Sequence, residues 1–210
     1  YFRILRSIKN RFGSTRESGI FEMRETGLLD VENPSEVFLA QRSAVSSGSA
    51  VISTLEGTRP ILVEVQALAT TTNYGMPQRT ASGFDGRRLS MLLAVLEKRI
   101  GLKMGTTDVF LNVVGGVKLN EPAADFGVTA AIASSMHNLP LPDDAVLIGE
   151  VGLTGEIRLV PHVDKRIVEA ARLGFKRAFV PPVAKDSIKN LKDFELISCD
   201  RLDSALDKML

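Results

Sequence analysis

Residues 113–136 read Val-Val-Gly-Gly-Val-Lys-Leu-Asn-Glu-Pro-Ala-Ala-Asp-Phe-Gly-Val-Thr-Ala-Ala-Ile-Ala-Ser-Ser-Met, and this stretch decides the fold. Its apolar start indicates a strand that ends at Gly115-Gly116, the polar residues 120–122 indicate a turn, and the small residues from Asp125 onward indicate a helix. Such a junction points backbone N–H groups and the positive end of a helix dipole at whatever lies in front of it. A nucleophile or a bound anion is often found at this kind of position.

The turn itself carries no nucleophile. Ala123 stands at its tip without a reactive side-chain atom, and Asp125 is expected to be the N-cap of the helix. The sequence also lacks Gly-x-Ser-x-Gly, His-Glu-x-x-His, Cys-x-x-Cys and a Walker-type phosphate loop. Ser134 or Ser135 could pair with Lys165, but a serine inside a helix usually hydrogen-bonds to its own backbone. We therefore assign no catalytic residue.

The composition is that of a globular protein. Of the 210 residues 44% are hydrophobic, which suffices for a sizeable core. No apolar run approaches the roughly 18 to 20 residues of a membrane span, and the first residues do not resemble a secretory signal. The lone Cys199 and two histidines do not support an internal disulfide or a metal site. We expect a cytoplasmic protein without a membrane partner, and a start in mid-strand indicates a piece of a longer chain.

The net charge of +1 hides a segregation of charges along the sequence. Residues 1–24 carry six basic and two acidic side chains, residues 119–157 carry only acids, and residues 158–192 carry nine basic against three acidic. Asymmetry of this kind permits a face that binds a polyanion. Solvated helix faces would explain the charges equally well.

Two strands of a hairpin are expected at the start of the chain. Residues 1–9 alternate apolar and basic side chains, and residues 20–23 read as the returning strand. The basic turn between them, residues 9–13, carries two cations and an aromatic ring. Residues 33–36, Asn-Pro-Ser-Glu, then break the pattern and could cap a short helix, so we expect a domain boundary near residue 35.

The rest of the chain predicts an α+β arrangement. Strands are expected at 49–55, 60–69, 108–114, 147–151, 154–160, 178–180 and 195–198, and helices at 87–99, 125–137, 165–173, 184–191 and from Asp203. Leu89, Leu92, Leu93 and Leu96 would form a buried stripe on the first of these helices. Asp164 is expected to cap the helix at 165–173. Residues 70–83 are expected to form a long polar loop, and loops of this length are often functional.

Three segments, 113–135, 149–158 and 166–175, resemble the proteolytic domain of Lon proteases. The resemblance implies the ribosomal S5 domain 2-like α+β fold. That family carries Gly-Pro-Ser-Ala-Gly at the central turn, with the serine as nucleophile, and a lysine in the helix after the Thr-Gly-Glu hairpin. In this sequence Ala123 takes the serine position, and the lysine position falls on or next to Asp164, with Lys165 one residue out of register. Losing the nucleophile costs a serine hydrolase on the order of 10⁶ in turnover, so the resemblance implies an inactive protease site.

A second resemblance covers nearly the whole chain. The motif Lys9-Asn10-Arg11-Phe12-Gly13, the segment 19–23, the break at 33–36 and a degenerate Lon-like domain together resemble the C-terminal part of the bacterial RadA (Sms) DNA repair family. A zinc finger and a RecA-like ATPase precede this region in that family. Residues 1–35 would then be the end of the ATPase domain, and residues 36–210 the Lon-like domain. The ATP, Mg²⁺ and zinc of the family would belong to parts outside this sequence.

The same resemblance implies a function in DNA repair and recombination. It implies a DNA-dependent ATPase that forms a hexameric ring, acts as a branch-migration helicase on single-stranded and branched DNA, and works with a recombinase of the RecA type. Lys9 and Arg11 would reach a phosphate of ATP on a neighbouring subunit, or else the DNA backbone.

Four cations of the Lon-like domain are candidates for DNA phosphate contacts: Arg79, Arg87, Arg88 and Lys118. A loop, a helix start and the end of a strand supply them, so they could converge. Arg87 and Arg88 lie in the first turn of the predicted helix, where a positive charge opposes the helix dipole, so each should have another partner. With only 6% aromatic residues, base stacking is not expected. Two alternatives stay open: a surviving Lon-like peptidase, and an oligomerisation scaffold that does not touch DNA.

Overall fold

A strand, a turn and a buried helix lie at the centre of the computed structural model, which describes residues 2–6, 8–12, 18–31, 33–40, 45–73, 75–183 and 191–210. Strand β7 (Thr107–Val113) runs into a 3-10 turn in which Gly115 has a φ of 78°. Helix α3 (Asp125–His137) follows a second 3-10 turn and is buried along its first ten residues. A side chain at Gly127 would collide with Ile52, so the glycine lets α3 pack closely on the sheet.

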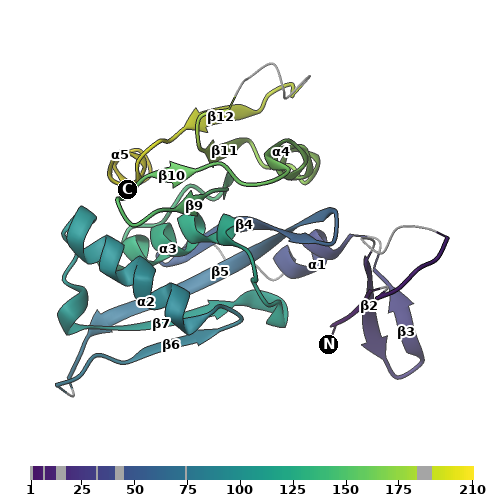
Figure 1. The fold of residues 1–210 in the computed structure, drawn as a ribbon, viewed down its shortest axis with the longest axis horizontal. Coiled ribbons are helices and arrows are strands. Elements are labelled where there is room, and N and C mark those ends of the chain that lie inside the picture. Colours follow the sequence, from purple (N-terminus) through teal and green to yellow (C-terminus); the bar gives the residue numbers. More distant parts are fainter. Residues whose placement is uncertain are drawn as a thin grey trace.

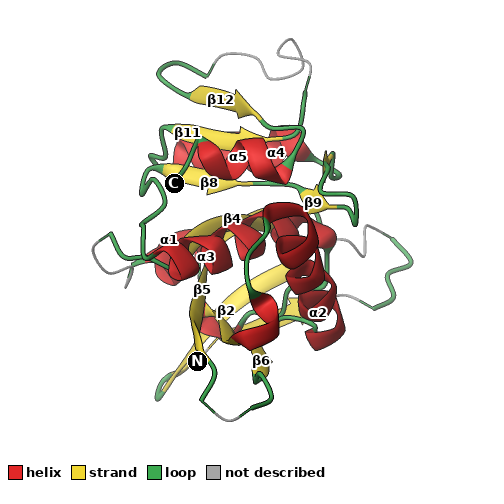
Figure 2. Ribbon diagram, turned by 90° about the vertical axis from the view of Figure 1, so that its left-hand side faces the viewer, coloured by secondary structure: helices red, strands yellow, loops and turns green. Residues whose placement is uncertain are grey.

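Seven strands form one mixed sheet in the order β12-β11-β8-β4-β5-β7-β6. The strands besides β7 are β4 (Ser49–Glu56), β5 (Arg59–Thr71), β6 (Arg79–Ser82), β8 (Ala145–Leu147), β11 (Arg177–Val180) and β12 (Glu195–Ser198). The predicted strands at 49–55 and 60–69 are β4 and β5, and they pair as an antiparallel hairpin. Figure 2 shows β12, β11, β8 and β4 following one another from one edge of the molecule. The β6 edge at the other end carries the candidate DNA contacts.

Side chains along the central strands alternate between two cores, one on each face of the sheet. Ile52 and Ile61 point into the core that is covered by α2 (Gly86–Val95), α3 and α5 (Leu202–Asp207). Val51 and Leu62 point into the core beneath α4 (Val163–Arg172). The predicted leucine stripe of α2 lies in the first core, and the helix continues as a π-helical turn (Leu96–Ile100). A short hairpin, β9 (Glu150–Val151) with β10 (Ile157–Arg158), crosses above α3.

The N-terminal residues form a separate antiparallel sheet of β1 (Phe2–Arg6), β2 (Ser18–Arg24) and β3 (Gly27–Asp30). The hairpin of β1 and β2 is confirmed, whereas β3 was not predicted. Figure 1 shows this sheet at one end of the molecule, beyond α1 (Pro34–Leu39). The Asn33 side chain accepts a hydrogen bond from the Glu36 amide, so the predicted cap is also confirmed. The domain boundary near residue 35 stays a prediction.

Three local predictions were wrong. Residues 79–82 form strand β6 instead of loop, paired in parallel with β7; only Ala81 is half-buried, so this edge strand shows no apolar alternation. Asp125 is not the N-cap of α3, because its carboxylate bonds elsewhere, and Asp164 does not cap α4, which begins at Val163 after His162 in a left-handed conformation. Of the predicted helix 184–191, residues 184–190 lie outside the described part. In that part no helix is long and apolar enough to cross a membrane.

Candidate functional site

The tip of the central turn is a buried alanine. Ala123 is 1% exposed and packs in the core beneath α4, among Val51, Ile148 and Ile167. Its carbonyl accepts a hydrogen bond from the Gly149 amide at 3.2 Å. The position at which a Lon protease has its serine therefore presents a methyl group to an apolar core.

An ion pair that sequence reasoning missed holds this turn in place. Arg166 is fully buried and donates to both carboxylate oxygens of Glu121, at 2.9 and 2.6 Å, and also to the Ser53 and Pro161 carbonyls. Glu121 Oε1 in turn accepts from the Leu55 amide at 2.7 Å. The pair thus fastens the turn to β4 and α4. A signal was available, because Arg166 lies one helical turn before Ala170 on the apolar face of α4.

The two residues next to Arg166 point away from the turn. Asp164 and Lys165, which were aligned with the protease lysine, are exposed on α4. Ser134 accepts from the Gly48 amide and Ser135 accepts from the Ala69 amide, both at 2.9 Å. Their hydroxyls fasten α3 to the start of β4 and to β5, so the structure does not bring a Ser–Lys pair together.

Arg88 has the partner that its place in a first helical turn predicted. Its Nε donates to Asp125 Oδ1 at 3.0 Å, Nη2 donates to Oδ2, and Nη2 also reaches the Val151 carbonyl at 3.3 Å. Asp125 accepts from the Val151 amide at 3.2 Å and its side chain is fully buried. Burial raises the pKa of the Asp125 carboxyl, while the Arg88 guanidinium opposes this shift. The Arg88 guanidinium thus links α2 to Asp125 of α3 and to Val151 of β9.

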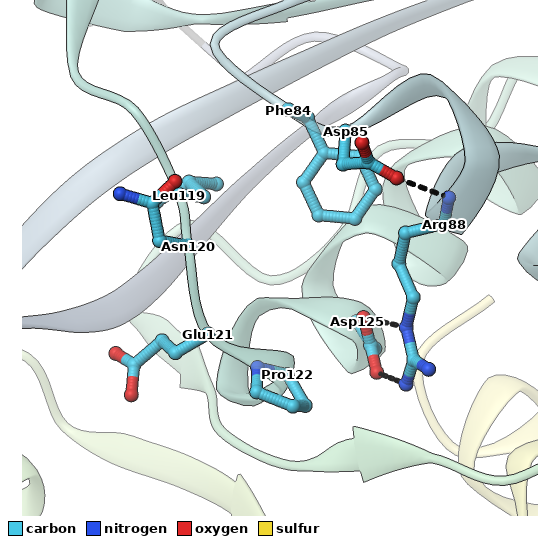
Figure 3. Close-up of a pocket in the computed structure, with 8 residues that line it drawn as sticks. All are labelled: Phe84, Asp85, Arg88, Leu119, Asn120, Glu121, Pro122 and Asp125. Atoms are coloured by element: carbon cyan, nitrogen blue, oxygen red, sulfur yellow. Dashed lines mark hydrogen bonds and ion pairs between the residues drawn. The ribbon is translucent and has the colours of Figure 1, made fainter.

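A hollow of about 260 Å³ opens beside this ion pair (Figure 3). It is lined by Phe84, Asp85, Arg88, Leu119, Asn120, Glu121, Pro122 and Asp125. A second hollow of about 230 Å³ adjoins it and adds Gly83 and Lys118 to the shared residues Phe84, Asp85, Leu119 and Asn120. The two segments that form the common wall pair as short extended chains, with the Leu119 amide donating to the Gly83 carbonyl at 2.8 Å.

The predicted cations fall into two places. Arg88 and the exposed Lys118 each line a hollow beside Phe84. Arg87 is exposed in the first turn of α2, two residues after the Asp85 N-cap, and lines neither hollow. Arg79 stands at the opposite end of β6, where its Nη2 donates to the Met104 carbonyl at 3.4 Å. The expected convergence of all four cations was therefore only partly correct.

The unit from residue 76 to residue 120, which comprises β6, α2 and β7, is strongly basic. It carries seven basic and three acidic side chains, whereas the whole chain has a net charge of only +1. All the basic side chains except Arg88 are exposed, and one of the acids, Asp108, is buried. The unit is therefore rich in exposed positive charge, although Arg99 lies toward Leu153 and α5 and not at the β6 edge.

The basic turn of the N-terminal sheet is displayed to solvent. Lys9, Asn10, Arg11 and Phe12 are all exposed, and Phe12 is 99% exposed. The Asn10 side chain accepts from the Phe12 amide at 3.0 Å, which shapes the turn. Gly13, the last residue of the motif, lies outside the described residues.

No group of three or more His, Cys, Asp or Glu side chains with metal-binding geometry occurs among the residues that the structure describes. Cys199 is buried there as a free thiol, and burial raises its pKa.

Sequence comparisons agree with this geometry. The family model of the Lon protease (S16) C-terminal proteolytic domain matches residues 98–210. DNA repair protein RadA from Bacillus subtilis (strain 168) is 53% identical over 205 residues, which are 98% of this chain and 45% of that protein. The RadA proteins of Listeria monocytogenes and Streptococcus pneumoniae are each 50% identical, over 100% and 99% of this chain and 46% and 50% of their own lengths.

The chain thus spans about half the length of the curated relatives it matches. The sequence-based resemblance to RadA is confirmed, and so is the α+β Lon-like fold class. Since the family model covers more than half of the residues, this chain belongs to the family of the Lon protease (S16) C-terminal proteolytic domain.

Proposed function

We propose that this chain serves in DNA repair and that its Lon-like domain binds DNA without cleaving peptides. The exposed cations of the β6–α2–β7 unit carry the proposal, because solvent-exposed lysines and arginines suit a phosphate backbone. Similarity to proteins named DNA repair protein RadA supports it. The buried methyl group of Ala123 argues against the peptidase alternative.

Among these cations we assign the phosphate contacts to Arg87 and Lys118 first. Both are exposed: Lys118 lines the second hollow beside Phe84, and Arg87 lies in the first turn of α2 next to Arg88 in sequence. Arg79 would contact a phosphate farther along β6. Arg88 would contribute by holding α2 in place, since its guanidinium already binds the buried Asp125.

The proposal extends to a longer protein of the RadA type. Such a protein would use ATP and Mg²⁺ in a RecA-like domain and zinc in a finger, and would assemble as a hexameric ring. It would act in the cytoplasm on single-stranded and branched DNA, as a branch-migration helicase, together with a recombinase of the RecA type. The exposed Lys9 and Arg11 would contact either ATP on the neighbouring subunit or DNA. Similarity to RadA is the support for each of these statements.

Fluorescence anisotropy with labelled single-stranded DNA across a salt series tests DNA binding directly. The double variant Arg87→Glu/Lys118→Glu should lose at least tenfold in affinity at low salt and show a shallower salt dependence. Each lost phosphate contact lowers the log–log slope by about 0.7 for a single strand. Lys176→Glu is the matched control, because Lys176 is exposed next to β11, several strands away in the sheet.

Equal binding by the double variant and the control would move the DNA contacts elsewhere in the chain. Binding by none of the proteins at low salt would favour the scaffold alternative, in which the domain assembles without touching DNA.

A further inference from the structure

The hollow in Figure 3 has an aromatic wall, the ring of Phe84, and the exposed Lys118 lines the hollow beside it. The ring of Phe84 lies across this space from Pro122, with Leu119 on one side and the Arg88–Asp125 pair on the other. The Glu121 carboxylate is turned toward Arg166 instead. The hollow is open at the surface, and its apolar lining consists of Phe84, Leu119 and Pro122.

We propose that this hollow takes one unpaired base of a single-stranded nucleic acid, stacked on Phe84. The inference rests on the proposed DNA binding and names the part of the DNA that enters the domain. Stacking of a base on an aromatic side chain is a recurrent way to hold single strands, and it tolerates any sequence because every base has a π-face. It also revises the expectation that base stacking is absent, which rested on the overall aromatic content alone.

The charges around the hollow favour a base inside and phosphates outside. Asp85 and Asp125 line the space, and a carboxylate repels a phosphate but accepts hydrogen bonds from the amino groups of bases. Asp85 Oδ1 already accepts from the Arg88 amide at 2.8 Å, which leaves its second oxygen for such a donor. The exposed Lys118 lines the adjoining hollow, and Arg87 is exposed in the first turn of α2, so these cations are available to the flanking phosphates.

The adjoining hollow gives the strand a path away from the base. It shares the Phe84 and Leu119 wall and includes Lys118. A nucleotide seated against Phe84 would therefore pass its backbone to a lysine without crossing the Asp125 carboxylate. A duplex could not use this site, because its bases are stacked within the helix.

The decisive experiment compares a normal oligonucleotide with one of equal length that contains consecutive abasic sites, in anisotropy titrations with the full chain of 210 residues. Both strands carry the same phosphates, so only a base contact separates them. The normal strand should bind about tenfold more tightly, since stacking on one aromatic side chain is worth on the order of 1–3 kcal/mol by alanine substitution. Equal affinities would overturn the proposal while leaving phosphate binding intact.

The variant Phe84→Leu tests the stacking wall. Leucine keeps an apolar side chain against the core, which Phe84 also contacts, but lacks a π-face. The difference between normal and abasic strands should shrink to less than about twofold in this variant, while duplex binding stays unchanged. An undiminished difference in a folded Phe84→Leu protein would also overturn the assignment to Phe84.

A 2-aminopurine base in the strand gives a readout that is independent of affinity. Its fluorescence should fall on binding to the unmodified protein, as it does on stacking, and an unchanged signal would contradict a stacked base. If no strand binds at all, the proposed DNA binding fails together with this inference. If normal and abasic strands bind alike, only the base site fails.

Discussion

Arg166 and Glu121 form a two-pronged ion pair at the turn where a Lon protease keeps its nucleophile, with N–O distances of 2.9 and 2.6 Å. The arginine side chain is fully buried and the glutamate side chain is 22% exposed. Two further carbonyls accept from the same guanidinium. These hydrogen bonds thus join β4, the turn before α3, and α4.

Arg166→Ala should destabilise the protein by about 3–5 kcal/mol, because it leaves the partly buried Glu121 carboxylate and two carbonyls without their donor. Urea unfolding measures this loss. Arg172→Ala on the same helix is the control: the Arg172 side chain is 50% exposed, and the Ser35 hydroxyl still donates to the 14% exposed Glu169, so the loss should be about 0–1 kcal/mol. The double change Arg166→Met/Glu121→Leu should cost less than Arg166→Ala. Similar losses for Arg166→Ala and Arg172→Ala would contradict a structural role for the buried pair.

Ala123→Ser should not restore a peptidase. The new hydroxyl would enter the apolar core beneath α4, and Asp164 and Lys165 are exposed and turned away. A buried hydroxyl without a partner costs about 1–3 kcal/mol, so the variant should be less stable and should not react with a fluorophosphonate probe. Mass spectrometry of the intact chain detects labelling. Stoichiometric labelling of Ala123→Ser that is absent in the unmodified protein would revive the peptidase alternative.

Ala123 and Arg166 show how much of the site the sequence could predict. The strand, turn and helix around Ala123 follow from apolar periodicity and turn residues, and α3 has the predicted bounds. The partners Arg166–Glu121 and Arg88–Asp125 are 45 and 37 residues apart. Tertiary packing brings these charges together and buries them, so local sequence patterns could not predict which residues would pair.

The edge strand β6 was not predicted, because its pairing also depends on tertiary structure. β6 pairs with one neighbour only, so Arg79, Thr80 and Ser82 remain exposed and the segment reads as a polar loop. The Phe84 wall was missed because average aromatic content says nothing about one well-placed ring.

Thr154→Val should raise the pKa of Glu156. Hydrogen bonding from the Thr154 hydroxyl is the largest cause that lowers this pKa from 4.5 to about 2, and Arg158 adds to it. A carboxyl with a lowered pKa contributes stability that is present above its unfolded value, near 4.5, and is lost as the pH falls toward 2. Carboxyl carbon NMR titration should therefore find that Glu156 protonates at a higher pH in Thr154→Val than in the unmodified protein, though still below its ordinary value, because the backbone hydrogen bond and Arg158 remain. Identical titration curves would contradict the assignment.

Gly127→Ala should destabilise the protein by about 1–3 kcal/mol, although alanine is the better helix former. The added methyl group would overlap with Ile52 where α3 crosses β4, and overpacking outweighs the gain of about 1 kcal/mol in helix propensity. Gly86→Ala at the start of α2 is the matched control, because a Cβ there meets nothing within 4 Å. Thermal unfolding should show a lower Tm for Gly127→Ala and an unchanged or higher Tm for Gly86→Ala. Equal Tm values would indicate that α3 can move away from the sheet.

Arg87 and Arg88 are neighbours in sequence, but their substitution should change the stability of the protein to different extents. Arg88→Ala removes the donor of the buried Asp125 carboxylate, and we expect a loss of about 1–3 kcal/mol because Arg88 itself is 27% exposed. Arg87→Ala removes an exposed side chain, and its stability should stay within about 0.5 kcal/mol.

The salt dependence of DNA binding should show the opposite order, with a change in Arg87→Ala and none in Arg88→Ala. Arg87→Ala should weaken single-strand binding and lower the salt slope by about 0.7, since one phosphate contact is lost. At a temperature where both variants are folded, Arg88→Ala should keep the salt slope of the unmodified protein, because its guanidinium binds Asp125 and not a phosphate. Anisotropy titrations at several salt concentrations measure both slopes. A reduced slope in folded Arg88→Ala would instead place Arg88 on the DNA backbone, as its position in the basic unit first suggested.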